Sequence, residues 1–243
     1  MDADLDHIRE KLVAMAEEDQ AVRAELAADG SLFDGYHPRM EEVHRRNAAA
    51  LLEIVERHGW PVRSLVGEQG ARAAWIILQH AIGDPSLQRR GLGWLQEAAA
   101  RGEVAPIEVA MLEDRIRCYE GRPQRYGTQF DWDASGQLSP YPVEDSEGVD
   151  RRRASIGLGP LDEALRSMRE QMAQGPEMPP KDWAERQRQK ELWLQKVGWR
   201  YRDPPNPALL QTAAAMLVWH SSFSLNVAAA AGLGCSFGIE EGL

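Results

Sequence analysis

The sequence predicts a mainly α-helical fold: a compact multi-helix domain with a short β-hairpin or ordered loop near 124–143. Apolar residues recur at three- and four-residue steps through most of residues 3–173, which is typical of one-sided helices. Glycine and proline separate these periodic segments. The chain has 243 residues, enough for a sizeable core, and one domain with a tail fits better than two small domains.

The first two helices are expected at 3–28 and 37–58, each with one apolar face and one charged face. Gly59 ends the second of them, and Trp60-Pro61 then forces a turn. The apolar stripes consist of Leu5, Ile8, Leu12, Met15, Val22 and Leu26 in the first helix, and of Met40, Val43, Leu51 and Ile54 in the second.

A third helix, at about 68–82, is apolar on every side and is therefore expected at the centre of the domain. Asp84-Pro85 is a helix start, with aspartate as N-cap and proline at the first helical position, and this helix ends at Gly102. A fifth helix, at about 106–120, is closed by Gly121.

Beyond residue 121 the pattern changes. Residues 124–132 and 138–143 flank Asp-Ala-Ser-Gly-Gln, which predicts the hairpin or ordered loop. Further helices are expected at 147–157, 160–173 and 182–196. The predicted organisation is a helical core domain at 1–174, a linker at 175–181, a charged helix at 182–203 and an uncharged Ala-rich C-terminal tail at 204–243.

Charge and cysteine usage narrow the functional classes. The formal charge is −10, with 38 acidic and 28 basic residues, which argues against nucleic acid as a partner; the run Arg151 to Arg153 is too short to change this. The acidic N-terminus lacks the layout of a secretory signal, so a cytoplasmic location is expected. Cys118 and Cys235 form neither a zinc-ligand set nor a disulfide framework, and no cofactor is expected.

The tail contains no charged residue between Pro204 and Ile239. A membrane helix over 208–233 has enough apolar residues to span a bilayer, but seven polar residues interrupt it, and each is costly in hydrocarbon. An Ala-rich helix packed on the domain, or a disordered extension, fits this composition better.

His80 is the first candidate site residue. On a helical wheel it falls between Ala73, Ile76 and Ile77, so we expect it to be buried or in a cleft. It is either a core histidine bonded to a backbone carbonyl, or a general base or ligand-binding group, because imidazole titrates near neutrality. Asp84 lies one turn away and could orient it, although capping alone explains Asp84. No second histidine or cysteine lies at ligand spacing, so no metal is expected.

Asp114 is the second candidate, because it falls inside the apolar stripe of the fifth helix. A buried carboxylate needs partners, and Arg115, Arg125 and His80 are the obvious ones. It is either half of a structural ion pair or a site residue. Glu113 and Arg117 fall off the stripe and are expected in solvent, whereas Cys118 lies within it, where burial makes a thiol a poor nucleophile.

The segment 124–129 lies between a helix end and a turn, and loops held by a scaffold often carry sites. Gly127 indicates a positive φ angle or a close backbone approach. Gln124, Tyr126, Thr128 and Gln129 offer neutral donors and acceptors suited to a polar ligand. Alternatively, they are the water-facing side chains of a hairpin edge.

The motifs together resemble an uncharacterised bacterial family, the domain of unknown function numbered 6624, over roughly residues 40–170. The motifs are His58-Gly-Trp-Pro61, Val66-Gly67, Gln79-His80-Ala81, Asp84-Pro85, Gln88, Asp114-Arg115, Gln124, Tyr126-Gly-Thr-Gln129, Val149-Asp-Arg-Arg152 and Gly157-Leu158.

The resemblance implies a common fold and a pocket around His80, Asp114, Arg115, Tyr126 and Gln129, but no activity. The family usually reads Gln-His-Ala-Asp, whereas this chain has Ile82 at the aspartate position. Any role that depends on that carboxylate is therefore absent or moved.

We therefore expect a polar small-molecule binding pocket or a metal-free hydrolase-type pocket. Its catalytic residues are His80 and Asp114; its binding residues are Gln79, Arg115, Gln124, Tyr126 and Gln129. The alternative is a non-catalytic interaction module, such as an immunity or adaptor protein, in which the same residues form a structural polar network.

Overall fold

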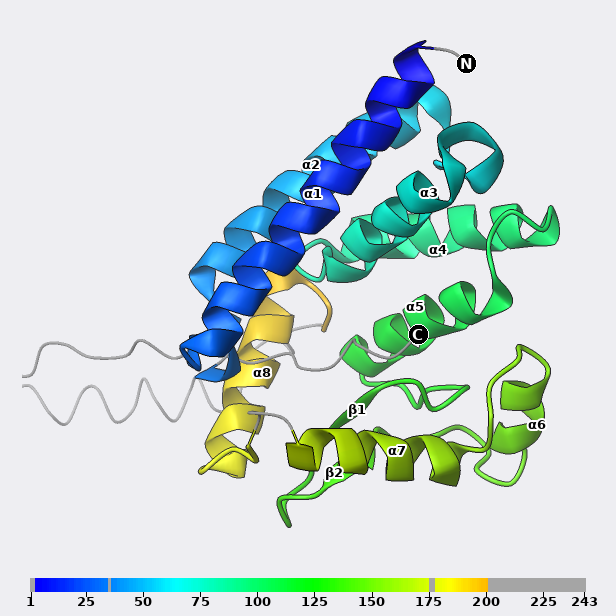
Figure 1. Ribbon diagram of the computed structural model, residues 1–243. Coiled ribbons are helices and arrows are strands. Elements are labelled where there is room, and N and C mark those ends of the chain that lie inside the picture. The colour runs from blue at the N-terminus through cyan, green and yellow to red at the C-terminus, as the bar shows by residue number, and fades with distance from the viewer. Residues whose placement is uncertain (1–2, 35, 175–177, 201–243) are drawn as a thin grey trace, which may run out of the picture.

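The computed structural model describes residues 3–34, 36–174 and 178–200, and it confirms a mainly helical fold (Figure 1). The elements in chain order are α1 (Ala3–Ala28), the 3-10 helix η1 (Ser31–Asp34), α2 (Pro38–His58), α3 (Arg63–His80), α4 (Pro85–Ala100), α5 (Pro106–Tyr119), β1 (Phe130–Trp132), β2 (Leu138–Pro140), α6 (Val149–Ala154), α7 (Leu161–Gln174) and α8 (Trp183–Val197).

The helices α1 to α5 form the upper part of the molecule. The long helices α1 and α2 lie side by side, both pack against α3, and α4 joins α3 to α5 (Figure 1). The predicted apolar stripes face this core, where Leu12, Leu51 and Leu78 are fully buried. Burying one such leucine contributes about 1.5–3 kcal/mol, so the amphipathic pattern is what orders these helices.

The third helix is central, as its composition predicts, with Ala74 and Ile77 in the core. Gly67 interrupts α3 with a φ of 72°, so its second half begins at the predicted position. The helix ends at His80, two residues earlier than expected. Asp84 caps α4 by accepting a hydrogen bond from the backbone N–H of Leu87 at 2.9 Å, which confirms the capping interpretation.

A glycine sets the spacing between α3 and α4. A Cβ atom on Gly91 would lie 2.5 Å from a methyl carbon of Leu78, which is fully buried. Only a glycine allows the two helices to approach so closely without displacing that side chain.

The hairpin predicted near 124–143 is present. Strands β1 and β2 pair in an antiparallel register that sets Phe130 opposite Pro140 and Trp132 opposite Leu138. The turn is held by Asp133, whose Oδ1 accepts hydrogen bonds from the backbone N–H groups of residues 135 and 137. An aspartate that bonds the backbone two residues on is typical of such turns.

The helix α8 packs between the helical part and the hairpin (Figure 1). Leu194 lies in the main core, and the indole of Trp199 donates a 2.7 Å hydrogen bond to the carbonyl of Ile82. Arg186 and Lys190 bind the carboxylate of Asp131 at 2.6 and 2.9 Å. The predicted charged helix therefore shares the core of the preceding helices.

Within the described residues, no helix has the length and apolarity needed to cross a bilayer. The predicted tail at 204–243, with its segment 208–233 and Cys235, lies outside the described residues, as do residues 175–177 of the predicted linker.

Candidate functional site

The histidine at the end of α3 contacts a carboxylate that the sequence did not single out. His80 Nδ1 lies 2.9 Å from Oδ2 of Asp19, in the middle of α1. The Asp19 side chain is 1% exposed and the His80 side chain 14% exposed. The carboxylate at Nδ1 is that of Asp19, not that of Asp84 or Asp114.

A second imidazole shares the same carboxylate. His44 Nε2, from α2, lies 3.2 Å from Asp19 Oδ2, without meeting hydrogen-bond geometry. The two imidazole rings are 5.0 Å apart between centroids. On its other nitrogen, His44 is 2.9 Å from the hydroxyl of Tyr36. Three helices thus bring two imidazoles and a carboxylate into contact, and we call Asp19, His44 and His80 the His–Asp cluster.

Burial and neighbouring charges shift the pKa values of Asp19 and His44. Burial raises the pKa of Asp19, but the close contacts and charges of His44 and His80 outweigh this effect, so the pKa of Asp19 lies well below the ordinary value. Burial lowers the pKa of His44. Burial also raises the pKa of Tyr36, which keeps its hydroxyl proton. Asp19 is therefore an anion beside a histidine that favours the neutral form.

The His–Asp cluster also leaves buried polar atoms without hydrogen bonds. They are Oδ1 of Asp19, Nε2 of His44 and, nearby on α2, Oδ1 of Asn47, whose amide nitrogen donates to the carbonyl of Met15. Unsatisfied buried atoms are rare in folded proteins, because each costs about 1–3 kcal/mol.

The residue types of the His–Asp cluster are also ones that can hold a metal ion. One donor atom from each of Asp19, His44 and His80 lies within 4.8 Å of the other two. The sequence analysis expected no metal because no second histidine lies at ligand spacing along the chain. The fold corrects that premise, since His44 comes from a different helix.

Asp114, the other expected catalytic residue, anchors the loop after α5. Its carboxylate accepts hydrogen bonds from the backbone N–H groups of Arg125 (2.6 Å), Tyr126 (3.1 Å) and Thr128 (3.0 Å), and from the Thr128 hydroxyl (3.0 Å). Burial raises the pKa of Asp114, and these donors offset that only in part. These contacts make Asp114 a structural anchor for the loop. Its partners are backbone N–H groups and the Thr128 hydroxyl, whereas an ion pair with an arginine side chain was one of the expectations.

The expected binding residues form a network next to Asp114. Arg115 donates to the carbonyl of Gln79 at 2.6 Å and, through Nε, to Oε1 of Gln129 at 3.4 Å. The side chain of Gln124 bonds the backbone of Gln129 and of Tyr141. These contacts tie α3 and α5 to the hairpin.

The side chains of two expected binding residues, Gln79 and Tyr126, are not part of that hydrogen-bond network. Gln79 is fully buried, and neither polar atom of its side chain has a hydrogen bond. The ring of Tyr126 stacks beneath the guanidinium of Arg125, at 5.6 Å. The expected site residues therefore fall into two groups: His80, which contacts Asp19, and the network around Asp114 and Arg115. Arg115 links the two groups through the carbonyl of Gln79, the residue before His80.

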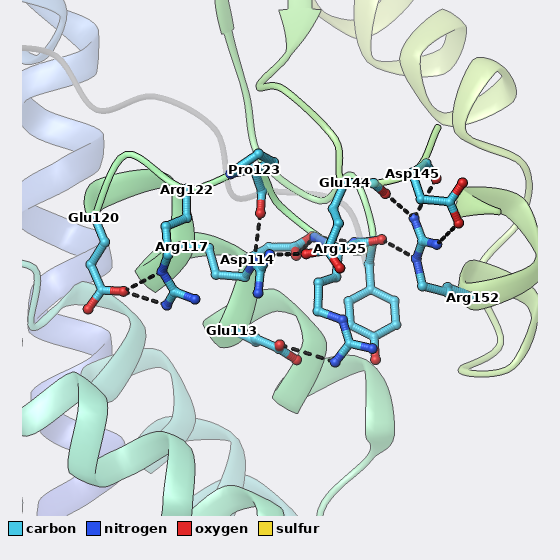
Figure 2. Close-up of polar contacts among 11 residues, drawn as sticks. Glu113, Asp114, Arg117, Glu120, Arg122, Pro123, Arg125, Glu144, Asp145 and Arg152 are labelled. Carbon is cyan, nitrogen blue, oxygen red and sulfur yellow. Dashed lines mark hydrogen bonds and ion pairs between the residues drawn. The ribbon is translucent and has the colours of Figure 1, made fainter. Parts of the chain in front are cut away.

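Arginines clamp the same loop from outside (Figure 2). Arg117 donates to the carbonyl of Pro123 at 2.6 Å and pairs with Glu144, while Arg125 pairs with Glu113 at 3.3 Å. The expectation that Glu113 and Arg117 lie free in solvent is wrong, because the loop folds back over both and leaves them 18% and 15% exposed.

The basic run at 151–153 also serves the loop. Arg152 donates to the carbonyl of Arg125 at 2.8 Å, as Figure 2 shows. Arg153 is buried and donates to the carbonyls of Tyr126 (2.7 Å) and Gly127 (3.1 Å). Gly127 has the positive φ, 66°, that its place in the loop indicated. These side chains hold the backbone in place.

The sequence model of a family of unknown function, DUF6624, matches residues 6–175. The chain belongs to this family. The match confirms the resemblance drawn from the motifs and begins about 35 residues earlier than expected, so it includes α1 and Asp19. No curated protein and no solved structure matches the chain.

Asp19 and His44 are the functional candidates that the sequence analysis missed, and a signal for them exists. Asp19 stands between Met15 and Val22 at steps of four and three, so it occupies the apolar stripe of its helix. His44 holds the equivalent position in α2, four residues after Met40. A polar residue inside an apolar stripe predicts a buried polar contact, the argument that identified Asp114.

Proposed function

We propose that this protein binds a small polar molecule and acts on it by hydrolase-type chemistry, with the His–Asp cluster as its reactive centre. The observation that supports this is the contact of two imidazoles with one fully buried carboxylate, with His80 as the partly exposed member. Carboxylate–imidazole pairs serve as acid–base groups because the carboxylate fixes the ring and stabilises its protonated form.

The binding groups next to this centre are amides. Gln129, only partly buried, is held by Arg115, and Arg115 in turn holds the backbone beside His80. An amide offers both a donor and an acceptor, which suits a polar ligand with carbonyl, amide or hydroxyl groups. A free Cys118 and the acidic chain fit a bacterial cytoplasmic protein that does not bind nucleic acid.

A second candidate is a non-catalytic interaction or adaptor module. It is favoured by the contacts of Asp114, Gln124 and Arg153, which bond the protein's own backbone. On that account the His–Asp cluster is likewise a packing element, and its loss only destabilises the fold.

A ligand-library thermal shift screen separates the two candidates, because a ligand that binds the native state raises its apparent stability. The variants are His80→Ala and, as a matched control, His58→Ala at the exposed end of α2. We expect compounds that raise the Tm of the wild type and of the control, but not that of the folded His80 variant. If every compound that shifts the wild type shifts the His80 variant equally, the reactive-centre proposal is wrong and the interaction module remains.

A further inference from the structure

We propose that Asp19, His44 and His80 together bind one divalent transition-metal ion, and that zinc is the ion their geometry fits best. This inference rests on the proposed function, because both place the reactive centre at the His–Asp cluster. The inference goes beyond the proposed function by naming the class of cofactor.

The first argument is distance. In a tetrahedral zinc site the nitrogen and oxygen ligands lie about 2.0–2.2 Å from the ion, which sets neighbouring ligand atoms roughly 3.3–3.6 Å apart. Asp19 Oδ2 is 2.9 Å from His80 Nδ1 and 3.2 Å from His44 Nε2, and all three donor atoms fit within 4.8 Å. Movements of a few tenths of an ångström would bring the two distances to Asp19 to ligand spacing, and the two imidazole nitrogens lie within 4.8 Å of each other.

The second argument is the donor set. Two imidazoles and one carboxylate are ligands that zinc and ferrous iron prefer, whereas calcium and magnesium take oxygen ligands. The site would have three protein ligands, as catalytic zinc sites do, and in such sites a water takes the further position. When bound there, the ion would lower the pKa of that water and supply a hydroxide nucleophile near neutral pH.

The third argument is the support around the ligands. A metal-bound histidine almost always bonds through its other nitrogen to an outer partner that fixes the ring. The hydroxyl of Tyr36 lies 2.9 Å from Nδ1 of His44, in the position of that partner. Trp193 of α8 packs edge-on against Tyr36, with ring centroids 5.5 Å apart, and holds it in place.

The fourth argument is the set of unsatisfied atoms. Asp19 Oδ1 and His44 Nε2 are buried in the same small space, and neither has a hydrogen bond. A cation held by the Asp19 carboxylate and by His44 Nε2 would give Nε2 a partner and balance the buried negative charge. Each imidazole would bind the ion through an unprotonated nitrogen, with its remaining proton on the other ring nitrogen.

The test is equilibrium dialysis of the full-length chain, stripped with EDTA, against zinc chloride. We expect one tightly bound zinc per chain, and a loss of affinity of at least about 10–100-fold in each of Asp19→Asn, His44→Gln and His80→Gln. His58→Gln is the matched control on α2 and should bind as the wild type does. The double variant His220→Gln/Cys235→Ser tests whether those two potential ligands hold the ion, and it should also retain binding.

Circular dichroism shows which variants fold. Should the cluster variants not fold, cobalt substitution in the wild type keeps the proposal testable, because its visible absorption reports the ligands. Bands of a low-coordinate nitrogen and oxygen site support the proposal. A thiolate charge-transfer band, the spectrum of hydrated cobalt, or zinc binding that survives in folded His44 and His80 variants would overturn it.

The two proposals fail in different ways. If the wild type binds no zinc, but ligand-induced stabilisation still depends on His80, the metal inference is wrong and the reactive centre works without a metal. If zinc binds stoichiometrically through the cluster, but no ligand effect depends on His80, the metal inference holds as a structural site and the proposed function fails.

Discussion

Replacing Asp114 by alanine removes the acceptor that fixes the loop between α5 and β1. Three backbone N–H groups and one hydroxyl lose their partner, and the donors lie at 2.6–3.2 Å in a partly buried site. Asparagine keeps one oxygen, which can still accept from Arg125 and Tyr126, but it turns an amide nitrogen toward the N–H of Thr128.

The structure sets the size of both effects. A hydrogen bond to a charged group contributes about 1.5–3 kcal/mol, but the four bonds are not additive and water replaces some of them, so Asp114→Ala should lower the free energy of unfolding by about 3–5 kcal/mol. Asp114→Asn loses chiefly the bond from Thr128 and the negative charge, and should lower it by about 1–3 kcal/mol.

Urea unfolding followed by circular dichroism measures these differences. The matched control is Glu113→Gln, the adjacent residue, whose partner Arg125 is 41% exposed. Such a pair contributes only about 0–1 kcal/mol. An Asp114→Ala variant within about 1 kcal/mol of the wild type would refute the anchoring role. If Asp114→Asn instead abolished ligand-induced stabilisation at unchanged stability, Asp114 would be a site residue.

Three further predictions concern the loop, the thiol and the pH response. Gly127→Ala should cost about 1–3 kcal/mol in urea unfolding, because φ is 66° and its Cβ would lie 2.7 Å from Leu161; an unchanged midpoint would contradict this. In a Cys235→Ser background, Cys118 should resist a thiol reagent until the protein unfolds, since burial raises its pKa to about 12, and rapid native labelling would disprove it. Asp131 is partly buried, which raises its pKa, but its cationic partners Lys190 and Arg186 outweigh this and lower the pKa. It therefore stabilises the fold above the ordinary aspartate pKa of about 3.9 and loses that contribution as pH falls through the lowered value. Asp131→Asn should flatten this part of the acid-unfolding curve, and an unaltered curve would refute the prediction.

The sequence predicts the helices well because their apolar stripes and caps are local features. Asp84-Pro85 marks the start of α4 without any knowledge of the fold, and the hairpin follows from the turn at 133–137. The end of α3 is less predictable. The carbonyl of Ile82 bonds the indole of Trp199, which is more than a hundred positions away in the chain.

The candidate site is only half predictable, because its members come from three helices that are distant in sequence. His80 is recognisable as a polar residue on an apolar helix. Its partners Asp19 and His44 occupy the same kind of position, but what each of them faces depends on how α1 and α2 pack against α3. A polar residue in an apolar stripe indicates that a partner exists, whereas only the packing identifies that partner.

The opposite difficulty affects Asp114. Its buried position on α5 resembles that of a site residue, but its partners are three backbone N–H groups of the loop that follows the helix. Every residue except proline has such a group, so the sequence does not show which ones bind a carboxylate. The same holds for Arg152 and Arg153, which bind carbonyl groups of that loop. Structural anchors and reactive groups are therefore hard to tell apart until their partners are known.

The most direct test of the His–Asp cluster is a crystal structure of the full-length protein grown with zinc, measured at the zinc absorption edge. We predict one strong anomalous peak, about 2.0–2.2 Å from a carboxylate oxygen of Asp19, Nε2 of His44 and Nδ1 of His80. Imidazoles of His44 and His80 that point apart, with no peak between them and Asp19, would contradict the account.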